Sequence, residues 1–227
     1  MHQIPLQVQL DDTATFDNFF AAENLQLVEK LNSLCRDDGE FLYCWGTSDS
    51  GKTHLAQALC RQFHESGLAA AYIPLKDKNL SPEILSGMNF MDLVCIDDID
   101  QVEGCEQWET AIFDLYNELK QEGKHLVVFA NKPPSSSDIK LADLRSRLTA
   151  MEIYRIESLD DEGKESLFIT RAENRGLEVS NDVVKFITTR KSRSVSDLMD
   201  ILDKLDHSSM ALKRKVTIPL VKELFDL

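Results

Sequence analysis

Short apolar runs alternate with amphipathic segments over the first 157 residues of the chain. Five of these runs have the composition of strands, and four are apolar at nearly every position, as strands covered on both faces of a sheet must be. The predicted strands are residues 41–45, 69–75, 91–96, 125–130 and 152–157. Helical periodicity predicts helices at residues 24–35, 52–65, 82–87, 106–121 and 141–148. This alternation is typical of an α/β fold in which a five-stranded parallel sheet has helices on both faces.

The strand pattern ends at Glu157, and the remaining residues show helical periodicity. Helices are expected at residues 160–175, 181–190, 194–207 and 219–226. Gly176 is expected to close the first of these, because glycine readily adopts the left-handed conformation that follows a helix. Earlier in the chain, Ser81 and Pro82 are typical of an N-cap and a first helical position. A small all-helical domain is therefore predicted to follow the α/β domain.

The balance of charge restricts what the protein can bind. The 227 residues carry 25 Lys and Arg against 39 Asp and Glu, a formal net charge of −14. Nucleic-acid phosphates need a basic face, so this composition argues against direct DNA binding and favours recruitment through another protein. Residues 1–157 hold a net charge of −13, while residues 158–227 are nearly neutral and include basic clusters at 190–193 and 213–215. These clusters are also consistent with solvated helix faces.

Cysteine usage, histidine usage and hydropathy indicate the setting of the protein. The five cysteines show no Cys-x-x-Cys spacing and the five histidines are scattered, so a reduced protein without zinc is expected. No apolar stretch approaches the ~20 residues of a membrane span, and residues 1–12 lack the basic start and apolar core of a signal peptide. The sequence therefore predicts a soluble, cytoplasmic protein.

Residues 46–53 match the phosphate-binding pattern G-x-x-x-x-G-K-[ST], directly after a predicted strand and before a predicted helix, as the motif requires. Glycines let backbone N–H groups turn toward phosphates, and the helix N-terminus adds partial positive charge. Lys52 is expected to reach the β and γ phosphates, and the Thr53 hydroxyl is a candidate ligand for Mg²⁺. The candidate nucleotide-binding residues are Gly46, Thr47, Ser48, Asp49, Ser50, Gly51, Lys52, Thr53 and the adjoining His54.

Polar residues follow two further strands, at the edge where an open α/β sheet places its ligands. Asp97 is expected to hold Mg²⁺ through water, and Asp98 is the candidate for polarising an attacking water. A turn or a helix cap would explain the same pair of acids. Asn131 follows the fourth predicted strand, where its amide can orient water between the γ phosphate and the acids. Its alternative role is simply to open the next loop.

Six segments spread over nearly the whole chain carry a resemblance to a known family. They are TFDNF (15–19), CIDDI (95–99), AIFDLYNEL (111–119), NKPP (131–134), DLRSRL (143–148) and VTIPLVKELFDL (216–227). With the phosphate-binding loop, they resemble the initiator branch of the AAA+ ATPases, that is, DnaA and its shorter relative Hda. The resemblance implies a P-loop AAA+ fold that binds ADP or ATP with Mg²⁺. It places the nucleotide-binding domain at residues 13–157 and a helical lid at residues 158–227.

Length separates the two members of this branch. DnaA carries a sizeable N-terminal domain and a C-terminal domain that reads origin DNA, whereas this chain has only about 12 residues before the TFDNF segment and stops at the end of the lid. The resemblance is therefore to Hda, which acts on DnaA rather than on DNA. The acidic composition is in keeping with such a role.

The resemblance assigns Arg147 the role of an arginine finger, which stabilises charge on a γ phosphoryl group held by another subunit. A surface ion pair with Asp143, four residues earlier on the same helix, is the alternative. Arg145 points about 200° away around that helix, so both arginines cannot serve one nucleotide. The family also places an arginine near the start of a lid helix. Ser196 occupies that position here, and Arg193 is the candidate nucleotide contact that replaces it.

The N-terminal residues are similar to peptides with which proteins dock on the bacterial sliding clamp, the beta subunit of DNA polymerase III. Gln3 would hydrogen-bond at the rim of a pocket, while Ile4, Leu6 and Val8 would present apolar side chains. An amphipathic edge strand would have the same pattern.

The resemblance as a whole implies a negative regulator of replication initiation. Such a protein docks on the DNA-loaded clamp and promotes hydrolysis of the ATP held by DnaA, so that it reaches the nucleoid only through partners. Two other functions stay open, namely a self-contained ATPase of the helicase-loader type and a nucleotide-binding adaptor without a catalytic role. A homo-oligomer is compatible with all three.

Overall fold

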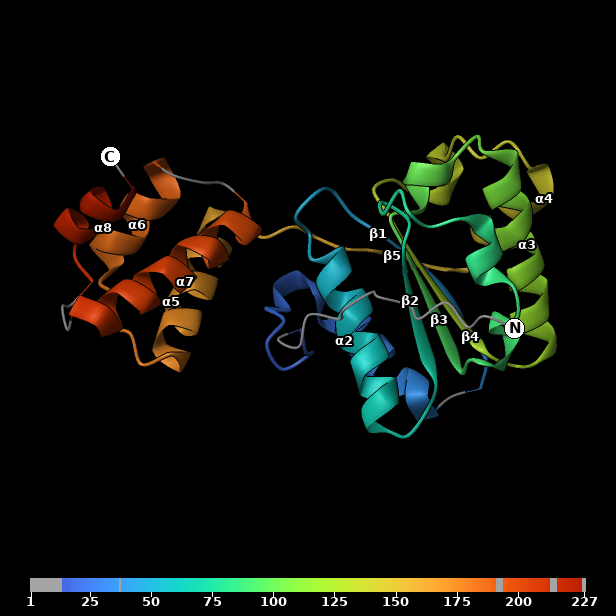
Figure 1. Ribbon diagram of the computed structural model, residues 1–227, viewed down its shortest axis with the longest axis horizontal. Helices are drawn as coiled ribbons and strands as arrows, with labels where there is room; N and C mark the ends of the chain where they lie inside the picture. Colours follow the sequence, from blue (N-terminus) through green and yellow to red (C-terminus); the bar gives the residue numbers. More distant parts are fainter. Residues whose placement is uncertain (1–13, 37, 191–193, 213–215, 226–227) are drawn as a thin grey trace. The chain divides into compact units, whose positions relative to one another are not determined.

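The computed structural model describes residues 14–36, 38–190, 194–212 and 216–225. The chain divides into two compact units, Met1–Ser158 and Leu159–Leu227, and each is described by itself (Figure 1). Within the described residues, no helix is both long enough and apolar enough to cross a membrane.

A five-stranded sheet forms the centre of the first unit, and all of its strands run parallel. The strands are β1 (Phe41–Trp45), β2 (Ala70–Pro74), β3 (Leu93–Asp97), β4 (His125–Ala130) and β5 (Glu152–Arg155). Their order is β2-β3-β4-β1-β5, which confirms the predicted parallel sheet. In the register, Trp45 lies beside Ala130, and Pro74 lies beside Asp97. The loops that follow β1, β3 and β4 therefore leave the sheet at one shared edge.

Helices cover both faces of the sheet, as Figure 1 shows for α2 on one side and α3 and α4 on the other. Leu42 and Cys44 of β1 pack in a buried layer with α1 (Leu25–Ser33) and α2 (Lys52–Glu65). Tyr43, between them, packs in the opposite layer with α3 (Glu106–Gln121) and α4 (Ala142–Thr149). Because successive strand residues point to opposite faces, nearly continuous apolar runs are what this arrangement requires.

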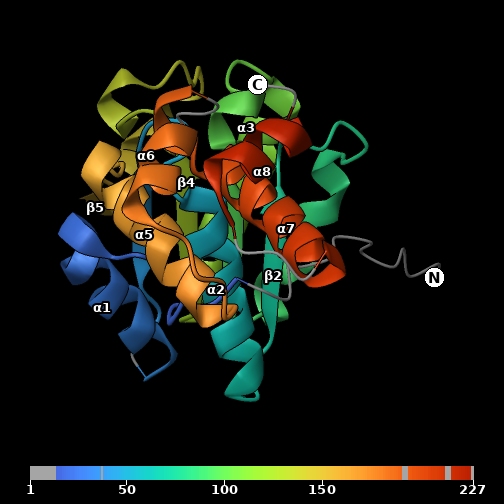
Figure 2. The ribbon, with the colours of Figure 1, turned by 90° about the vertical axis from the view of Figure 1, so that its left-hand side faces the viewer.

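The second unit contains only helices in its described part (Figure 2). They are α5 (Asp161–Asn174), α6 (Asn181–Arg190), α7 (Val195–Leu212) and α8 (Ile218–Phe225). Asp160 caps α5 by accepting a 2.7 Å hydrogen bond from the backbone of Gly163. Gly176 ends the first helix with a φ of +72°, as predicted. Buried side chains such as Phe168, Ile187 and Leu202 give this unit its own core.

Two predicted helices are not regular α-helices over their whole predicted length, and the helix predicted at residues 194–207 continues to Leu212. Residues 82–87 form only one 3₁₀ turn, Pro82–Leu85, and Ser81 makes no side-chain capping bond to it. The turn ends because Ser86 is extended and Gly87 has a φ of +75°. The predicted helix at residues 24–35 is α1 flanked by short 3₁₀ turns. Asn24 explains the break at its start, since its side chain exchanges two hydrogen bonds with the backbone of Glu157.

Candidate functional site

The loop between β1 and α2 is shaped for close approach of its own backbone. A Cβ atom at Gly46 would lie 2.5 Å from Oγ of Ser50 and 2.7 Å from the carbonyl oxygen of Ile156. Gly51 has a φ of +90°, a backbone conformation that residues other than glycine rarely adopt. Asp49 is left-handed as well, with a φ of +62°. The two motif glycines are therefore required by the path of the loop itself.

Lys52 fills the centre of this loop and is buried, with 7% of its surface exposed. Its Nζ donates hydrogen bonds of 2.9 Å to the Gly46 carbonyl and 2.7 Å to the Thr47 carbonyl. Burial lowers the pKa of Lys52, while the charges of Asp98 and Asp97 act in the opposite direction. A cation thus lies under a rim that consists of exposed residues Thr47, Ser48 and Asp49.

The two residues predicted to hold Mg²⁺ are brought together by the fold. The Thr53 hydroxyl donates a 2.8 Å hydrogen bond to Oδ2 of Asp97, although 44 residues separate them in sequence. Tyr72 donates a 2.9 Å bond to the same oxygen. Asp97 is fully buried, and its Oδ1 has no hydrogen-bond partner among the described residues. Burial, and then the charge of Asp98, raise the pKa of Asp97. A hydroxyl beside a carboxylate with one unsatisfied oxygen fits the ligand preference of a hydrated Mg²⁺.

Asp98 turns the chain away from β3 with a left-handed backbone, at a φ of +58°. It precedes the 3₁₀ turn Ile99–Val102 but makes no side-chain capping bond to it. Its Oδ2 lies 3.9 Å from Nζ of Lys76, and its side chain is 17% exposed. A left-handed aspartate costs conformational energy, and such strain is commonly found at functional positions. The side chain therefore stands at the shared edge without serving as a helix cap.

Asn131 is held in place by Asp100, which was not among the residues predicted from the sequence. Its backbone N–H and its Nδ2 both donate to Oδ2 of Asp100, at 2.7 and 3.0 Å. Burial raises the pKa of Asp100, against the hydrogen bond from Asn131. Next along the chain, Lys132 forms ion pairs with Glu103 at 2.8 Å and with Asp138 at 2.6 Å. The end of β4 is thus fastened to the segment that follows β3.

His54 faces the segment before the first helix. Its Nε2 lies 2.9 Å from the carbonyl oxygen of Thr15, and its ring centroid lies 5.6 Å from that of Phe19. Phe19 is also the residue that a Cβ at Gly51 would meet, at 2.7 Å. The described contacts of His54 therefore attach the 15–19 segment to the start of α2.

Arg147 and Arg145 lie on different sides of α4. The Arg147 guanidinium is exposed and lies over the ring of Tyr116 from α3, with Cζ 5.6 Å from the ring centroid. It forms no ion pair with Asp143 or with any other residue that the structure describes. Arg145 instead donates a 3.3 Å hydrogen bond to the carbonyl of Ile139. It lines a shallow cavity on its own side of the helix.

The residues around Arg147 lie near the amino end of β1, whereas the phosphate loop follows its carboxyl end. Tyr116 packs on Phe41, with ring centroids 4.7 Å apart, and Phe41 is the first residue of β1. Gly46 follows the last residue of the same strand. Since a strand rises about 3.3 Å per residue, roughly 13 Å of β1 separate the two locations. Arg147 thus lies near the opposite end of β1 from the nucleotide site of its own chain.

Sequence reasoning missed Tyr72 and Asp100, which position Asp97 and Asn131 through hydrogen bonds. Their positions in the sequence could have indicated this. Tyr72 is near the carboxyl end of β2, and Asp100 lies just after the acidic pair that ends β3. Other predicted residues, which are Gln3, Ile4, Leu6, Val8 and Arg193, lie outside the described residues. Ser196 is exposed in the first turn of α7.

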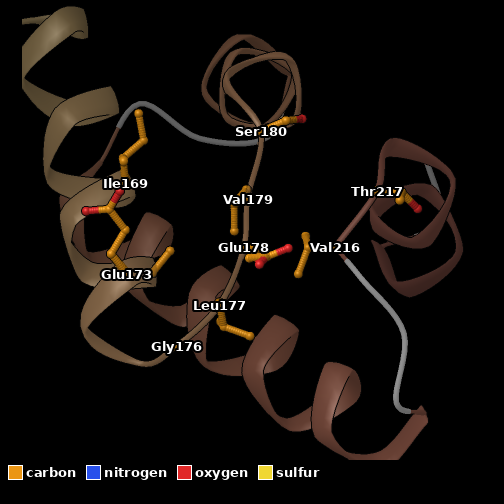
Figure 3. Close-up of a pocket in the computed structure, with 10 residues that line it drawn as sticks. Ile169, Glu173, Gly176, Leu177, Glu178, Val179, Ser180, Val216 and Thr217 are labelled. Atoms are coloured by element: carbon orange, nitrogen blue, oxygen red, sulfur yellow. The ribbon is translucent and has the colours of Figure 1, made fainter.

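A separate cavity of about 700 Å³ lies in the helical unit (Figure 3). Its wall is largely apolar, with Ile169, Leu177 and Val216 among its residues, and its charged side chains are Glu173 and Glu178. Carboxylates repel phosphate, and the lining contains no basic side chain. This cavity is therefore unsuited to a nucleotide.

The sheet order, the phosphate loop before α2, the acidic end of β3 and the following helical unit define an AAA+ fold of the P-loop class. Residues 10–153 match the family model of the bacterial DnaA ATPase domain, and residues 161–225 match that of the Hda lid domain. The chain belongs to the bacterial DnaA ATPase-domain family and is an Hda-like member of it.

The chain is also similar to a curated protein and to solved structures. A Haemophilus influenzae protein described as uncharacterised is 40% identical over 228 residues, which is 99% of each chain. Domain III of DnaA from Thermotoga maritima is 22% identical with a TM-score of 0.75, covering 96% of this chain and 98% of that one. The replication initiator DnaA bound to AMPPCP and single-stranded DNA is 20% identical with a TM-score of 0.75, covering 90% and 69%. At these identities the two structures show the shared fold alone.

Proposed function

We propose that the protein is a nucleotide-binding regulator that promotes hydrolysis of the ATP held by DnaA and docks on the DNA-loaded sliding clamp. Residues 13–157 would form its nucleotide-binding domain and residues 158–227 its lid. The observation that carries the proposal is the location of Arg147. It is exposed, lacks an ion pair among the described residues and lies at the edge of the sheet opposite its own phosphate loop.

Such an arginine can act only on a nucleotide that another molecule presents. In phosphoryl transfer, a guanidinium supplied in trans stabilises the charge that develops on the γ phosphoryl group and contributes ~10³ to 10⁵ in rate. Its planar fork can donate two hydrogen bonds to phosphate oxygens at once, which lysine cannot. The family assignment makes DnaA the natural holder of that nucleotide.

The chain's own loop would bind an adenine nucleotide, either ADP or ATP. Backbone N–H groups of residues 46–51 would surround the phosphates, with Lys52 beneath them. Thr53 and the free Oδ1 of Asp97 would hold Mg²⁺, which neutralises phosphate charge when it is bound. Lys52 would exchange its two carbonyl partners for phosphate oxygens. Bound nucleotide would chiefly fix the angle between the two units and so the geometry offered to DnaA.

Clamp docking would be the task of Gln3, Ile4, Leu6 and Val8. A short peptide anchored by a few side chains suits a protein whose first 157 residues carry a net charge of −13, because it brings that acidic domain to DNA without phosphate contacts. A pull-down with clamp loaded on DNA tests this part. Gln3→Ala should lose binding while Gln7→Ala, at a spacer position of the same peptide, should keep it. Equal binding by both variants would remove the docking peptide from the account.

A self-contained ATPase is the second candidate function, because Lys52, Asp97, Asp98 and Asn131 meet at one edge as hydrolysis requires. It predicts substantial turnover by the isolated protein that Lys52→Ala abolishes. The proposed regulator instead predicts slow intrinsic turnover. The deciding experiment combines DnaA loaded with γ-labelled ATP, clamp-loaded DNA and this protein, and follows phosphate release. Release should depend on both this protein and the loaded clamp. Release equal to that of DnaA alone would reject the proposal.

A further inference from the structure

Two cations gather on one aromatic ring at the α3–α4 face. Nζ of Lys120 lies 5.8 Å from the centroid of the Tyr116 ring, and Cζ of Arg147 lies 5.6 Å from it. The two charges are therefore less than roughly 12 Å apart, although they come from different helices. Both side chains are exposed.

Neither cation is neutralised by an acid in the described part of the chain. Lys120 has Tyr116 four residues before it on α3, the helix ends one residue after it at Gln121, and none of the described ion pairs involves it. Arg147 has Asp143 four residues before it and still forms no ion pair. Both cations are thus without an ion pair among the described residues, in a domain whose net charge is −13.

The ring that holds them is itself fixed. Tyr116 is 4% exposed and packs against Phe41 with an interplanar angle of 59°. Attraction between a cation and an aromatic ring favours both charged groups near this position. Lysine remains mobile on its four-carbon stem, whereas the arginine fork is planar and directional.

We propose that Lys120 is a second cation of the arginine-finger site and that it binds the γ phosphate of the nucleotide presented by the partner. This inference rests on the proposed function, since it assumes that Arg147 meets a nucleotide in trans. The two residues would divide the work. Arg147 would stabilise charge that develops during phosphoryl transfer, while Lys120 would attract the charge already present on the bound phosphates.

This division has a kinetic consequence. Loss of a contact made equally before and during the reaction weakens binding without lowering the maximal rate. Lys120→Ala should therefore raise the concentration of this protein that gives half-maximal stimulation of DnaA, by roughly threefold to fivefold, and leave the maximal rate unchanged. Lys120→Arg should restore the wild-type value. Arg147→Ala should lower the maximal rate itself.

The source of negative charge is decided by changing the nucleotide on the partner. Affinity for DnaA is measured with DnaA holding a non-hydrolysable ATP analogue and, separately, ADP. If Lys120 contacts phosphate, Lys120→Ala loses more affinity for the triphosphate form than for the diphosphate form. An equal loss in both forms would mean that Lys120 contacts a group other than the γ phosphate, such as an acidic side chain of the partner, and the inference would be wrong.

The controls separate this inference from the function on which it rests. Lys78→Ala, at an exposed lysine after β2, should behave as wild type. If Arg147→Ala fails to stimulate while Lys120→Ala matches wild type in both assays, the proposed function stands and the second cation is rejected. If Arg147→Ala stimulates as wild type does, the proposed function fails and the inference falls with it.

Discussion

The hydroxyl of Thr53 and the carboxylate of Asp97 are joined by a 2.8 Å hydrogen bond that links the start of α2 to the end of β3. Tyr72 donates to the same carboxylate oxygen. Both donors are therefore spent on Oδ2, and the buried Oδ1 has no partner in the described structure. A buried carboxylate that lacks a donor on one oxygen destabilises the folded chain. The position of this carboxylate thus carries a cost in stability that a bound cation would relieve.

The first prediction concerns this carboxylate. Asp97→Asn should raise the free energy of unfolding at pH 7 by roughly 1 kcal/mol in nucleotide-free protein with EDTA, because asparagine retains an oxygen for both hydroxyls and removes the buried charge. Since the pKa of Asp97 is raised on folding, the cost of its ionisation is present above the folded pKa and absent below the unfolded value near 3.8. The gain should therefore shrink as the pH is lowered, and urea unfolding at a series of pH values measures it.

Asp114→Asn is the matched control for this series, since Asp114 is an exposed aspartate of α3. It should show no comparable gain at pH 7. A loss of stability in Asp97→Asn at pH 7, or a gain that is the same at every pH, would contradict the account of the unsatisfied oxygen.

The second prediction compares two glycines with similar backbones. Gly51 and Gly67 have φ values of +90° and +77°, but a Cβ would meet Phe19 at 2.7 Å at the first position and nothing within 4 Å at the second. Alanine should cost about 1 kcal/mol at either site through the backbone. Only Gly51→Ala should also reduce affinity for a fluorescent ADP analogue, by at least roughly tenfold, because the added methyl group forces Phe19 and the loop apart. Similar affinities for the two variants would count against the loop as the nucleotide site.

The third prediction concerns a buried carboxylate outside the nucleotide site. Glu109 of α3 is 2% exposed and accepts hydrogen bonds from the backbone N–H groups of Gly104, Lys140 and Leu141, at 2.7 to 3.1 Å. Glu109→Ala would leave these donors unsatisfied, which should cost about 3 kcal/mol and lower Tm by roughly 6–12 °C. Calorimetry measures this. Glu118→Ala, at an exposed position of the same helix, should change Tm by little. A similar decrease in Tm for both variants would refute a special role for Glu109.

The sequence predicts the sheet well because its strands are buried on both faces, so each appears as an apolar run that polar helices interrupt. It predicts the P-loop because that chemistry is local to residues 46–53. Contacts between segments that are distant in the chain could not be predicted from the sequence. The hydrogen bonds from Asn131 to Asp100 and from Tyr72 to Asp97 exist only once the strands are ordered in the sheet. Local spacing could not decide the neighbour of Arg147 either.

That neighbour shows how tertiary packing overrides spacing. Asp143 lies four residues before Arg147, the spacing of a helical ion pair, yet the guanidinium lies over Tyr116, 31 residues away. Packing of α3 against α4 presents the ring, and an exposed ion pair would contribute little in competition. The arginine is therefore left with its charge available at the surface.

The central claim is that this charge acts on a nucleotide held by DnaA. Its most direct test is the single-turnover rate of ATP hydrolysis by DnaA, measured with clamp-loaded DNA and saturating wild type, Arg147→Ala, Arg147→Lys or Arg145→Ala. The account predicts that both Arg147 variants lose at least roughly 100-fold in the stimulated rate, because lysine cannot replace the planar fork. Arg145→Ala, on the other side of α4, should match wild type. An Arg147→Ala rate within about twofold of wild type would contradict the account.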